Sequence, residues 1–365
     1  MRISRFIIYF CIVLVLVSPA LISCAQEKPA PIPAPAPAPT PAPTPKPAPA
    51  PTKVYNWKLF DSYTTKDYLH RQMSLIIDTI ENETNGSLKI ELFAKGEHPF
   101  ETGDMLKAVQ NRDAEVVVAH SPYLVGVEPI LALYSLPMFW PSTRLDDIDT
   151  IYSATRDDVV QPILDTWNAE LLTYAVWPPV NLHAKVPVTS FDSLKGQRIR
   201  GMSPEDVELA NVMGGIGVAV AWSECPTAMA TGVIDGILTS SGPMYDTGMF
   251  EYVKFSTLFE SSMNITNYLV NRDALAGLDA ATRNAFLKVW EDFGPTLSEG
   301  NLSDSAKKVA WAAIDYGVTI VAPTSQFRKE VSEEAAVKIW QPWAQKTGAL
   351  DTLDSVKQIM AAFAK

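Results

Sequence analysis

Residues 191–236 read FDSLKGQRIRGMSPEDVELANVMGGIGVAVAWSECPTAMATGVIDG, a stretch in which strand-like and helix-like patterns alternate. Gly214-Gly215-Ile216-Gly217 lacks the spacing of a phosphate-binding loop and is predicted to be a helix-to-strand turn. Strands that alternate with helices indicate an α/β fold. The pattern predicts strands over 196–200, 218–220 and 233–236, and helices over 204–213 and 224–232.

Two arginines lie close together at the end of the first of these strands. In a strand, Arg198 and Arg200 point to one face and Ile199 to the other. Because the strand ends at a Gly-Met-Ser-Pro turn, the later arginine can turn into a cleft, where its guanidinium would match a carboxylate bidentately. The pattern alone leaves a second interpretation open, in which both arginines are solvated charges at a strand edge.

The globular region begins at Val54 and continues the same alternation. Strands are predicted in VYNWKLFDSY, SLKIELFA and AEVVVAH, with helices over 66–83 and 102–112 between them. AEVVVAH is apolar enough to be buried on both faces of a sheet. Two long strands are then predicted over Ala169–Trp177 and Met263–Asn271. The last part predicts a helical region over 279–315 interrupted by Gly294-Pro295, the strand VTIVAP and two closing helices.

This order of elements predicts two α/β lobes between which the chain crosses more than once. We expect the first lobe to contain residues 54–176 and 264–298, and the second lobe to contain residues 177–263 and 299–365. The hinge is expected where the chain crosses, near Tyr174–Trp177 and Met263–Tyr268. A cleft between two such lobes, near the carboxyl ends of strands, is where a small ligand binds.

The N-terminal segment predicts export. A short basic start precedes FIIYFCIVLVLV, an apolar run of signal-peptide length. Leu21-Ile22-Ser23-Cys24 resembles the lipobox of bacterial lipoproteins, so residues 1–24 are predicted to be a lipoprotein signal with Cys24 as the lipid-bearing residue; an ordinary cleaved signal is the alternative. Residues 25–53 are rich in Pro and Ala and predict an extended linker. The mature protein is therefore expected on the cell envelope, in the periplasm or on the outer face of the cytoplasmic membrane.

Composition excludes several classes of function. The net charge of −11 argues against nucleic-acid binding. Apart from the cysteines of the signal and lipobox, only Cys225 remains, so no intrachain disulfide and no cysteine metal site is possible in the mature chain. No nucleophile, metal or phosphate motif is present, so the protein is predicted to be no enzyme and to bind no cofactor. Four scattered histidines are predicted to be structural or surface residues: His70, His98, His120 and His183.

The stretch 191–236 resembles the second lobe of the solute receptors of TRAP transporters, the DctP-type substrate-binding proteins. Upstream, Ser135-Leu136-Pro137-Met138-Phe139 is similar to another segment of that family, and the resemblance covers essentially everything after the linker. The matching positions are Leu194-Lys195-Gly196, Ile199-Arg200, Met213-Gly214-Gly215, Val218, Glu224, Ala228 and Thr231-Gly232-Val233-Ile234-Asp235-Gly236.

The resemblance implies a two-lobed periplasmic-binding-protein-like fold with an interlobe cleft and a long late helix. It implies an extracytoplasmic receptor that closes on a small organic acid and delivers it to TRAP membrane subunits, without making or breaking a bond. Two alternatives remain: a substrate-binding lipoprotein that serves an ABC importer or a sensor, and a surface-anchored hydrolase on an α/β scaffold.

The resemblance also implies a ligand site. Arg200 aligns with the arginine that binds the ligand carboxylate, and Trp222 with an aromatic wall of the pocket. Thr239 or Ser240 is expected to contact ligand. Sialic-acid-type members carry a further arginine about twenty residues before the clamp; this chain has Trp177-Pro178-Pro179-Val180 there, so a monocarboxylate with an apolar or aromatic body is the expected ligand. The other aromatic residues expected nearby are Trp177, Tyr123, Phe139 and Tyr245, whereas Trp140 is expected in the core.

Overall fold

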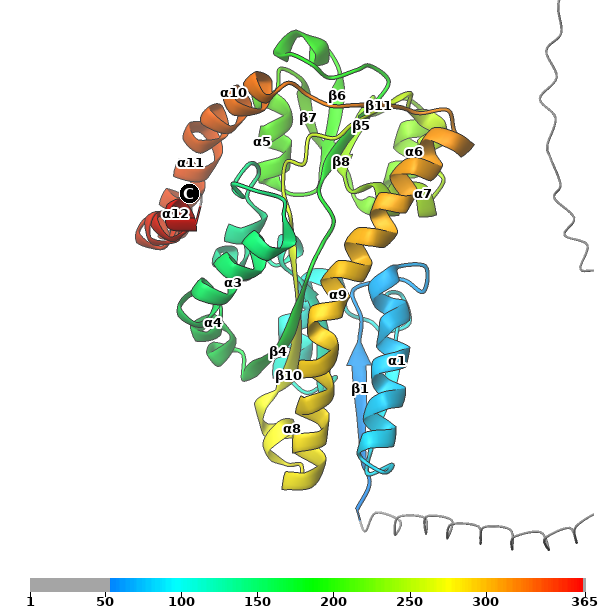
Figure 1. The fold of residues 1–365 in the computed structure, drawn as a ribbon, viewed down its shortest axis with the longest axis vertical. Coiled ribbons are helices and arrows are strands. Elements are labelled where there is room, and N and C mark those ends of the chain that lie inside the picture. Colours follow the sequence, from blue (N-terminus) through cyan, green and yellow to red (C-terminus); the bar gives the residue numbers. More distant parts are fainter. Residues whose placement is uncertain (1–52, 364–365) are drawn as a thin grey trace, which may run out of the picture. The chain divides into compact units, whose positions relative to one another are not determined.

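The computed structural model describes residues 53–363, which form two β-sheets with helices packed around them (Figure 1). The predicted signal peptide, the lipidation site at Cys24 and all but the last residue of the predicted linker lie outside the described residues. None of the described helices is both long enough and apolar enough to cross a membrane.

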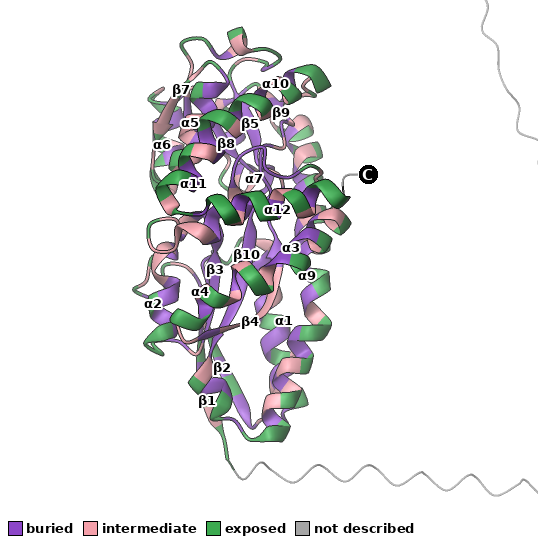
Figure 2. Cartoon of the chain, turned by 90° about the vertical axis from the view of Figure 1, so that its left-hand side faces the viewer, coloured by how far each residue is buried: buried purple, intermediate pink, exposed green. Residues whose placement is uncertain are grey.

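The first sheet has five strands in the order β2-β1-β3-β10-β4. β1 runs parallel to β2 and β3, whereas β10 runs antiparallel to β3 and β4. All five residues of β3 are buried, as the sequence predicts, because helices cover both faces of the sheet (Figure 2). The strands are β1 (Tyr55–Phe60), β2 (Leu88–Phe93), β3 (Val116–His120), β4 (Ala169–Val176) and β10 (Ile265–Asn271).

The second sheet has six strands in the order β11-β9-β5-β8-β6-β7. β6 lies between β8 and β7 and runs parallel to both, so the end of β6 is a central position of the sheet. β5 pairs antiparallel with β8 and β9. The strands are β5 (Asn181–Ala184), β6 (Arg198–Gly201), β7 (Ile216–Ala219), β8 (Gly236–Thr239), β9 (Phe255–Thr257) and β11 (Thr319–Val321).

The helices pack on these sheets through the apolar positions that their sequences predict. Residues of α1 and α9 share one core with one face of the first sheet, and residues of α2 pack on the opposite face. The α-helices are α1 (Tyr68–Glu83), α2 (Met105–Gln110), α3 (Leu145–Val159), α4 (Gln161–Thr166), α5 (Pro204–Val212), α6 (Cys225–Ala230), α7 (Ser241–Asp246), α8 (Arg272–Ala276), α9 (Ala280–Asp315), α10 (Ser325–Ala335), α11 (Gln341–Thr347) and α12 (Leu350–Phe363).

Shorter turns complete the described chain. A π-helical turn joins α10 to α11, so residues 325–347 form one helical stretch, which with α12 gives the two closing helices that the sequence predicts. The short turns are η1 (Thr102–Asp104), η2 (Ser121–Tyr123), η3 (Pro129–Ser135), η4 (Phe191–Leu194), η5 (Trp222–Glu224), η6 (Met249–Tyr252) and the π-turn η7 (Ala336–Trp340).

The chain passes between the two sheets at neighbouring points. It leaves the first sheet after β4 and returns to it before β10, and these two crossings are hydrogen bonded, with the Trp177 N–H donating to the Asn264 carbonyl at 2.7 Å. Helix α9 runs alongside both sheets (Figure 1). It is bonded to the end of β4, where the Ser298 hydroxyl accepts from the Val176 N–H at 3.0 Å. Adjacent crossings of this kind are the expected place of a hinge.

The C-terminal helix packs against residues that the sequence assigns to the first lobe. α12 packs on α3, although residues 299–365 are assigned to the second lobe by the sequence. The two sheets thus have the expected chain order, and the exact lobe boundaries stay a prediction.

Three elements differ from the sequence prediction. β7 begins at Ile216, two residues before the strand predicted over 218–220. The strand predicted over 233–236 begins only at Gly236, because Gly232 at φ 71° ends α6 and the N–H groups of Val233 and Ile234 donate back to the Ala228 carbonyl. The helix predicted to be interrupted at Gly294-Pro295 is continuous, with Pro295 inside α9. Gly294 lets α9 pack close to β4, since a Cβ there would lie 2.2 Å from the Thr173 hydroxyl oxygen.

Candidate ligand-binding site

A cavity of about 90 Å³ lies where the carboxyl ends of strands from the two sheets meet. It opens into a wider groove of about 920 Å³ that shares half of its lining. Most lining residues lie at the end of a strand or follow one within four residues, which is where α/β sheets place their ligands. The lining consists of Ser62, Tyr63, Thr64, Asp67, Lys95, Thr102, His120, Tyr123, Trp177, Arg200, Met202, Trp222, Thr239 and Pro243.

Arg200 is a buried cation that faces this cavity without an ion-pair partner. Its side chain comes from the end of β6, and the residue is 2 % exposed. The Nε–H donates to the Val220 carbonyl at 3.0 Å, whereas the buried Nη1 has no hydrogen-bond partner among the described residues. No described carboxylate lies within ion-pair distance of the guanidinium. Burying an unpaired charge costs free energy, so an anion that binds beside this arginine would be favoured.

Arg198 has a different role, although it lies only two residues away. Its Nε and Nη2 donate to the two carboxylate oxygens of Asp235 at 3.0 and 3.2 Å, and Nη2 also donates to the Gly232 carbonyl. This fork ties β6 to the turn before β8. The Arg198 side chain is 43 % exposed and lies outside the cavity lining. Its guanidinium is therefore already occupied by a carboxylate of the chain.

One wall of the cavity is aromatic. Tyr63 stacks on Trp177 with ring centroids 4.7 Å apart and an interplanar angle of 14°. The Trp177 indole N–H donates to the Ser240 hydroxyl at 2.8 Å, which connects the crossing after β4 to the end of β8. Trp222 also lines the cavity, with its ring centroid 5.8 Å from the guanidinium carbon of Arg200. A flat ligand can stack on such walls, because aromatic rings supply large apolar area with defined geometry.

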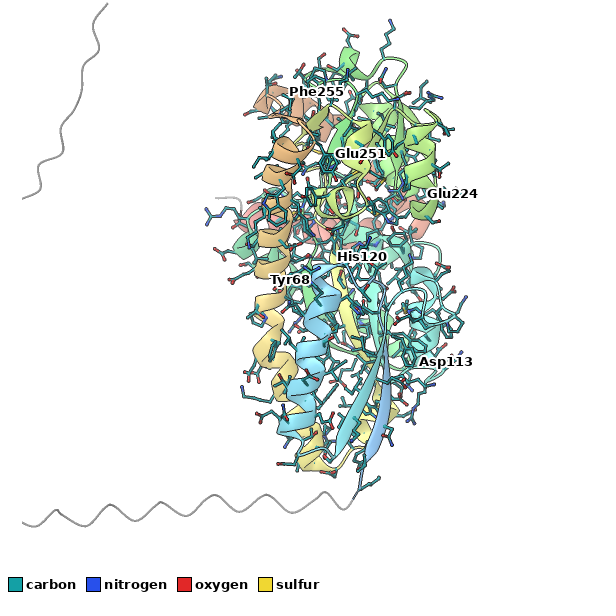
Figure 3. The ribbon with its side chains drawn as sticks, turned by 90° about the vertical axis from the view of Figure 1, so that its right-hand side faces the viewer. Tyr68, Asp113, His120, Glu224, Glu251 and Phe255 are labelled. Atoms are coloured by element: carbon teal, nitrogen blue, oxygen red, sulfur yellow. The ribbon has the colours of Figure 1, made fainter. Side chains whose placement is uncertain are left out.

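His120 ends β3 and lies near the level where the two sheets meet (Figure 3). Its Nδ1 is 3.0 Å from the Tyr63 hydroxyl and 3.0 Å from the Thr266 hydroxyl, and these two hydroxyls also bond to each other. Burial, with a smaller contribution from Lys95, lowers the pKa of His120 to about 3. The imidazole is therefore neutral at physiological pH and adds no charge to the cavity.

The structure brings together most of the residues that the sequence predicts for the site. Arg200, Trp222, Thr239, Trp177 and Tyr123 all line the cavity. Ser240 lies behind Trp177 as the acceptor of its indole N–H.

Phe139 and Tyr245 lie outside the cavity lining. Phe139 packs in a core against Trp140 and Trp340, and the Tyr245 hydroxyl donates to Asp315 on α9 at 2.5 Å. Trp140 is a core residue, as expected, with its indole N–H donating to the carbonyls of Tyr134 and Met263.

Sequence reasoning missed lining residues from the first lobe, including Tyr63, Lys95 and His120. A signal was present, because each of them ends a predicted strand or follows one by a few residues.

The fold and the cavity together define a two-lobed solute-binding protein. Consistent with this, residues 61–346 match the family described as bacterial extracellular solute-binding protein, family 7 (DctP). The match spans most of the chain, and the protein belongs to this family. The resemblance to TRAP solute receptors is thereby confirmed.

Individual relatives are distant. The chain is 23% identical to the C4-dicarboxylate-binding periplasmic protein DctP of Rhodobacter capsulatus over 285 residues, covering 77% of this chain and 84% of the relative. Among solved structures, it is similar to DctP7 of Bordetella pertussis, an extracytoplasmic solute receptor with pyroglutamic acid, at TM-score 0.74 and 23% identity, covering 86% of this chain and 100% of that chain. A TRAP solute-binding protein from Desulfovibrio salexigens with orotic acid has TM-score 0.76 and 16% identity over 85% of this chain and 100% of that chain.

Proposed function

We propose that this protein is an extracytoplasmic receptor that binds a small organic acid in the cavity at Arg200 and delivers it to a TRAP-type secondary transporter. The observation that carries the proposal is the buried guanidinium with an unpartnered Nη1 in a cavity at the carboxyl ends of the strands. A carboxylate there would supply the missing charge and accept the missing hydrogen bond.

The shape and lining of the cavity support a compact ligand. Pyroglutamate, orotate and the C4-dicarboxylates, which are named for the relatives, share a carboxylate on a small body. In this chain the aromatic rings of Tyr63, Tyr123, Trp177 and Trp222 surround the cavity. The sequence-based expectation of an apolar or aromatic body is compatible with these walls. We expect ligand contacts from both sheets to favour closure of the lobes, because a ligand shifts a conformational equilibrium only by binding one state better.

The test is native mass spectrometry of the purified protein, followed by thermal-shift screening of organic acids against their amides. We expect a retained small molecule, or stabilisation by at least one acid and by none of the matched amides. No response to any acid would contradict the proposal. Hydrolysis of esters or glycosides by the purified protein would instead support the hydrolase alternative.

The buried carboxyl of Asp206 is expected to make the affinity for the ligand depend on pH. Its carboxyl is at the start of α5, and burial raises its pKa to about 6, against the lowering effect of Arg200. When a ligand carboxylate takes up the charge of Arg200, the pKa of Asp206 rises further and a proton is bound. The affinity for an acid that stays ionised throughout should therefore fall roughly three- to tenfold between pH 5 and pH 8.

Isothermal titration at the two pH values measures this effect. Asp206→Asn should flatten the profile while it retains binding. His120 is not expected to contribute, because its pKa of about 3 keeps it neutral over this range. An unchanged slope in Asp206→Asn would assign the pH dependence to another group.

Lipid anchoring is a further part of the proposal, and it is supported by the lipobox-like Leu21-Ile22-Ser23-Cys24. Such an anchor would keep the receptor close to its membrane subunits. Cys24→Ser is expected to move the protein from the membrane fraction to the soluble fraction of cells. A wild-type protein that is already soluble after export would favour an ordinary cleaved signal.

A further inference from the structure

A second cation lines the same cavity as Arg200 but comes from the other sheet. Lys95 follows the end of β2 in the first sheet, whereas Arg200 ends β6 in the second sheet. Lys95 is half-buried, and its backbone N–H donates to the Tyr63 carbonyl at 2.9 Å, which fixes the base of the side chain beside the cavity. Its ammonium lies 5.9 Å from the ring centroid of Tyr123.

No acidic side chain of the described residues lies within ion-pair distance of Lys95, although Glu101 lines the wider groove. Asp67 is the carboxylate of the cavity lining, and its Oδ2 accepts hydrogen bonds from the Thr64 N–H at 2.8 Å and the Thr64 hydroxyl at 2.7 Å. Asp67 lies outside ion-pair distance of Lys95. The lining thus presents two cations without ion-pair partners and one carboxylate that is engaged elsewhere.

Tyr123 lies close to both cations. The Lys95 ammonium faces its ring, and the positive charge of Arg200 opposes the effect of burial, which raises the pKa of the Tyr123 phenol. The two positive charges therefore converge on one small cavity from different sheets. A ligand with a single carboxylate at Arg200 would leave Lys95 without a partner, whereas a ligand with a second anionic group would occupy both.

We propose that Lys95 is a specificity residue that binds a second anionic group of the ligand, so that the cavity selects short dianionic acids over monoanions of equal size. This inference rests on the proposed function and differs from the monocarboxylate that the sequence alone favours. A dianion held between Arg200 and Lys95 contacts both sheets at once, and its second charge therefore contributes to closure as well as to affinity.

The test compares diacids with their monoamides, which have nearly the same shape and one charge fewer. The probes are succinate and succinamate, glutarate and glutaramate, and adipate and adipamate, titrated calorimetrically at pH 7.5. In the wild type, at least one diacid is expected to bind about tenfold more tightly than its monoamide, and this ratio should shrink as salt is raised. In Lys95→Met the ratio should fall to about one, and in Lys95→Arg it should be retained.

Lys89→Met is the matched control, since Lys89 lies on β2, the strand that leads to Lys95, but its side chain is 55 % exposed and paired with Glu81 at 3.4 Å. It should leave the diacid preference unchanged. Equal binding of diacids and monoamides in the wild type, or a preference that survives Lys95→Met, would overturn the role of Lys95. If no diacid binds while another acid binds in an Arg200-dependent way, only this inference fails. If no acid of any kind binds, the proposed function itself fails.

Discussion

Replacing Arg200 with methionine is expected to weaken the binding of the organic acid by about thirtyfold to several thousandfold. The guanidinium is buried, and its Nη1 has no partner among the described residues, so a ligand carboxylate would form a charge-assisted hydrogen bond in a desolvated site. Removing one partner of such a pair typically costs about 2–5 kcal/mol of binding free energy, because the other charge is left unpaired. Titration calorimetry with the acid found by screening measures the loss.

The matched control for this prediction is Arg198→Met. Arg198 belongs to the same strand, but its guanidinium is held by Asp235 outside the cavity. This variant should lose some stability and keep its affinity within about threefold, since exposed ion pairs contribute little. Arg200→Met is expected to remain folded, because replacing a buried charge without an ion-pair partner by an apolar side chain removes a desolvation cost. Equal losses of affinity in both variants would contradict the assignment of the clamp to Arg200.

Replacing Gly217 with alanine is expected to lower the free energy of unfolding by about 3–4 kcal/mol. Gly217 lies on β7 where α5 crosses it, and a Cβ there would lie 2.1 Å from the carbonyl oxygen of Val207 and 2.8 Å from its carbonyl carbon. Both atoms belong to the helix backbone, so α5 as a whole would have to move. Denaturant unfolding, followed by tryptophan fluorescence, measures the effect.

Gly232→Ala separates the packing effect from backbone strain. Gly232 has φ of 71°, which alanine adopts at a cost of about 1–2 kcal/mol, but nothing lies within 4 Å of the added Cβ. It should therefore be clearly less destabilising than Gly217→Ala. A Gly217→Ala variant within 1 kcal/mol of the wild type would show that α5 is not packed against β7 as described.

The sequence predicts the elements well where hydrophobic periodicity is strong. β3 is an apolar run and β10 a run of strand-forming residues, and all residues of both are buried. The helix-to-strand turn predicted at Gly214-Gly215-Ile216-Gly217 lies at Gly214 and Gly215, with Gly214 at φ 90°, and β7 begins at Ile216. The start of β8 is missed because Val233 and Ile234, which look strand-like, are held by backbone hydrogen bonds to α6. The continuity of α9 through Pro295 depends on packing along the helix, which periodicity does not report.

The candidate site is predicted for one lobe and incompletely for the other. Arg200 and Trp222 belong to a motif in one continuous stretch, so a resemblance can identify them. Lys95 and His120 reach the same cavity only because β2 and β3 end opposite β6, and such an approach of separate sheets is a property of the tertiary fold. Phe139 and Tyr245 are predicted near the site but lie outside it. Phe139 packs in a core and Tyr245 bonds to α9, and the sequence does not distinguish such aromatic residues from those of a ligand site.

A crystal structure of the protein with the acid selected by screening tests the central claim most directly. The account predicts that the acid lies in the cavity beside Trp177 and Trp222, with a carboxylate oxygen about 2.7–2.9 Å from Nη1 of Arg200. An acid bound elsewhere on the protein, or bound in this cavity with its carboxylate directed away from Arg200, would contradict it.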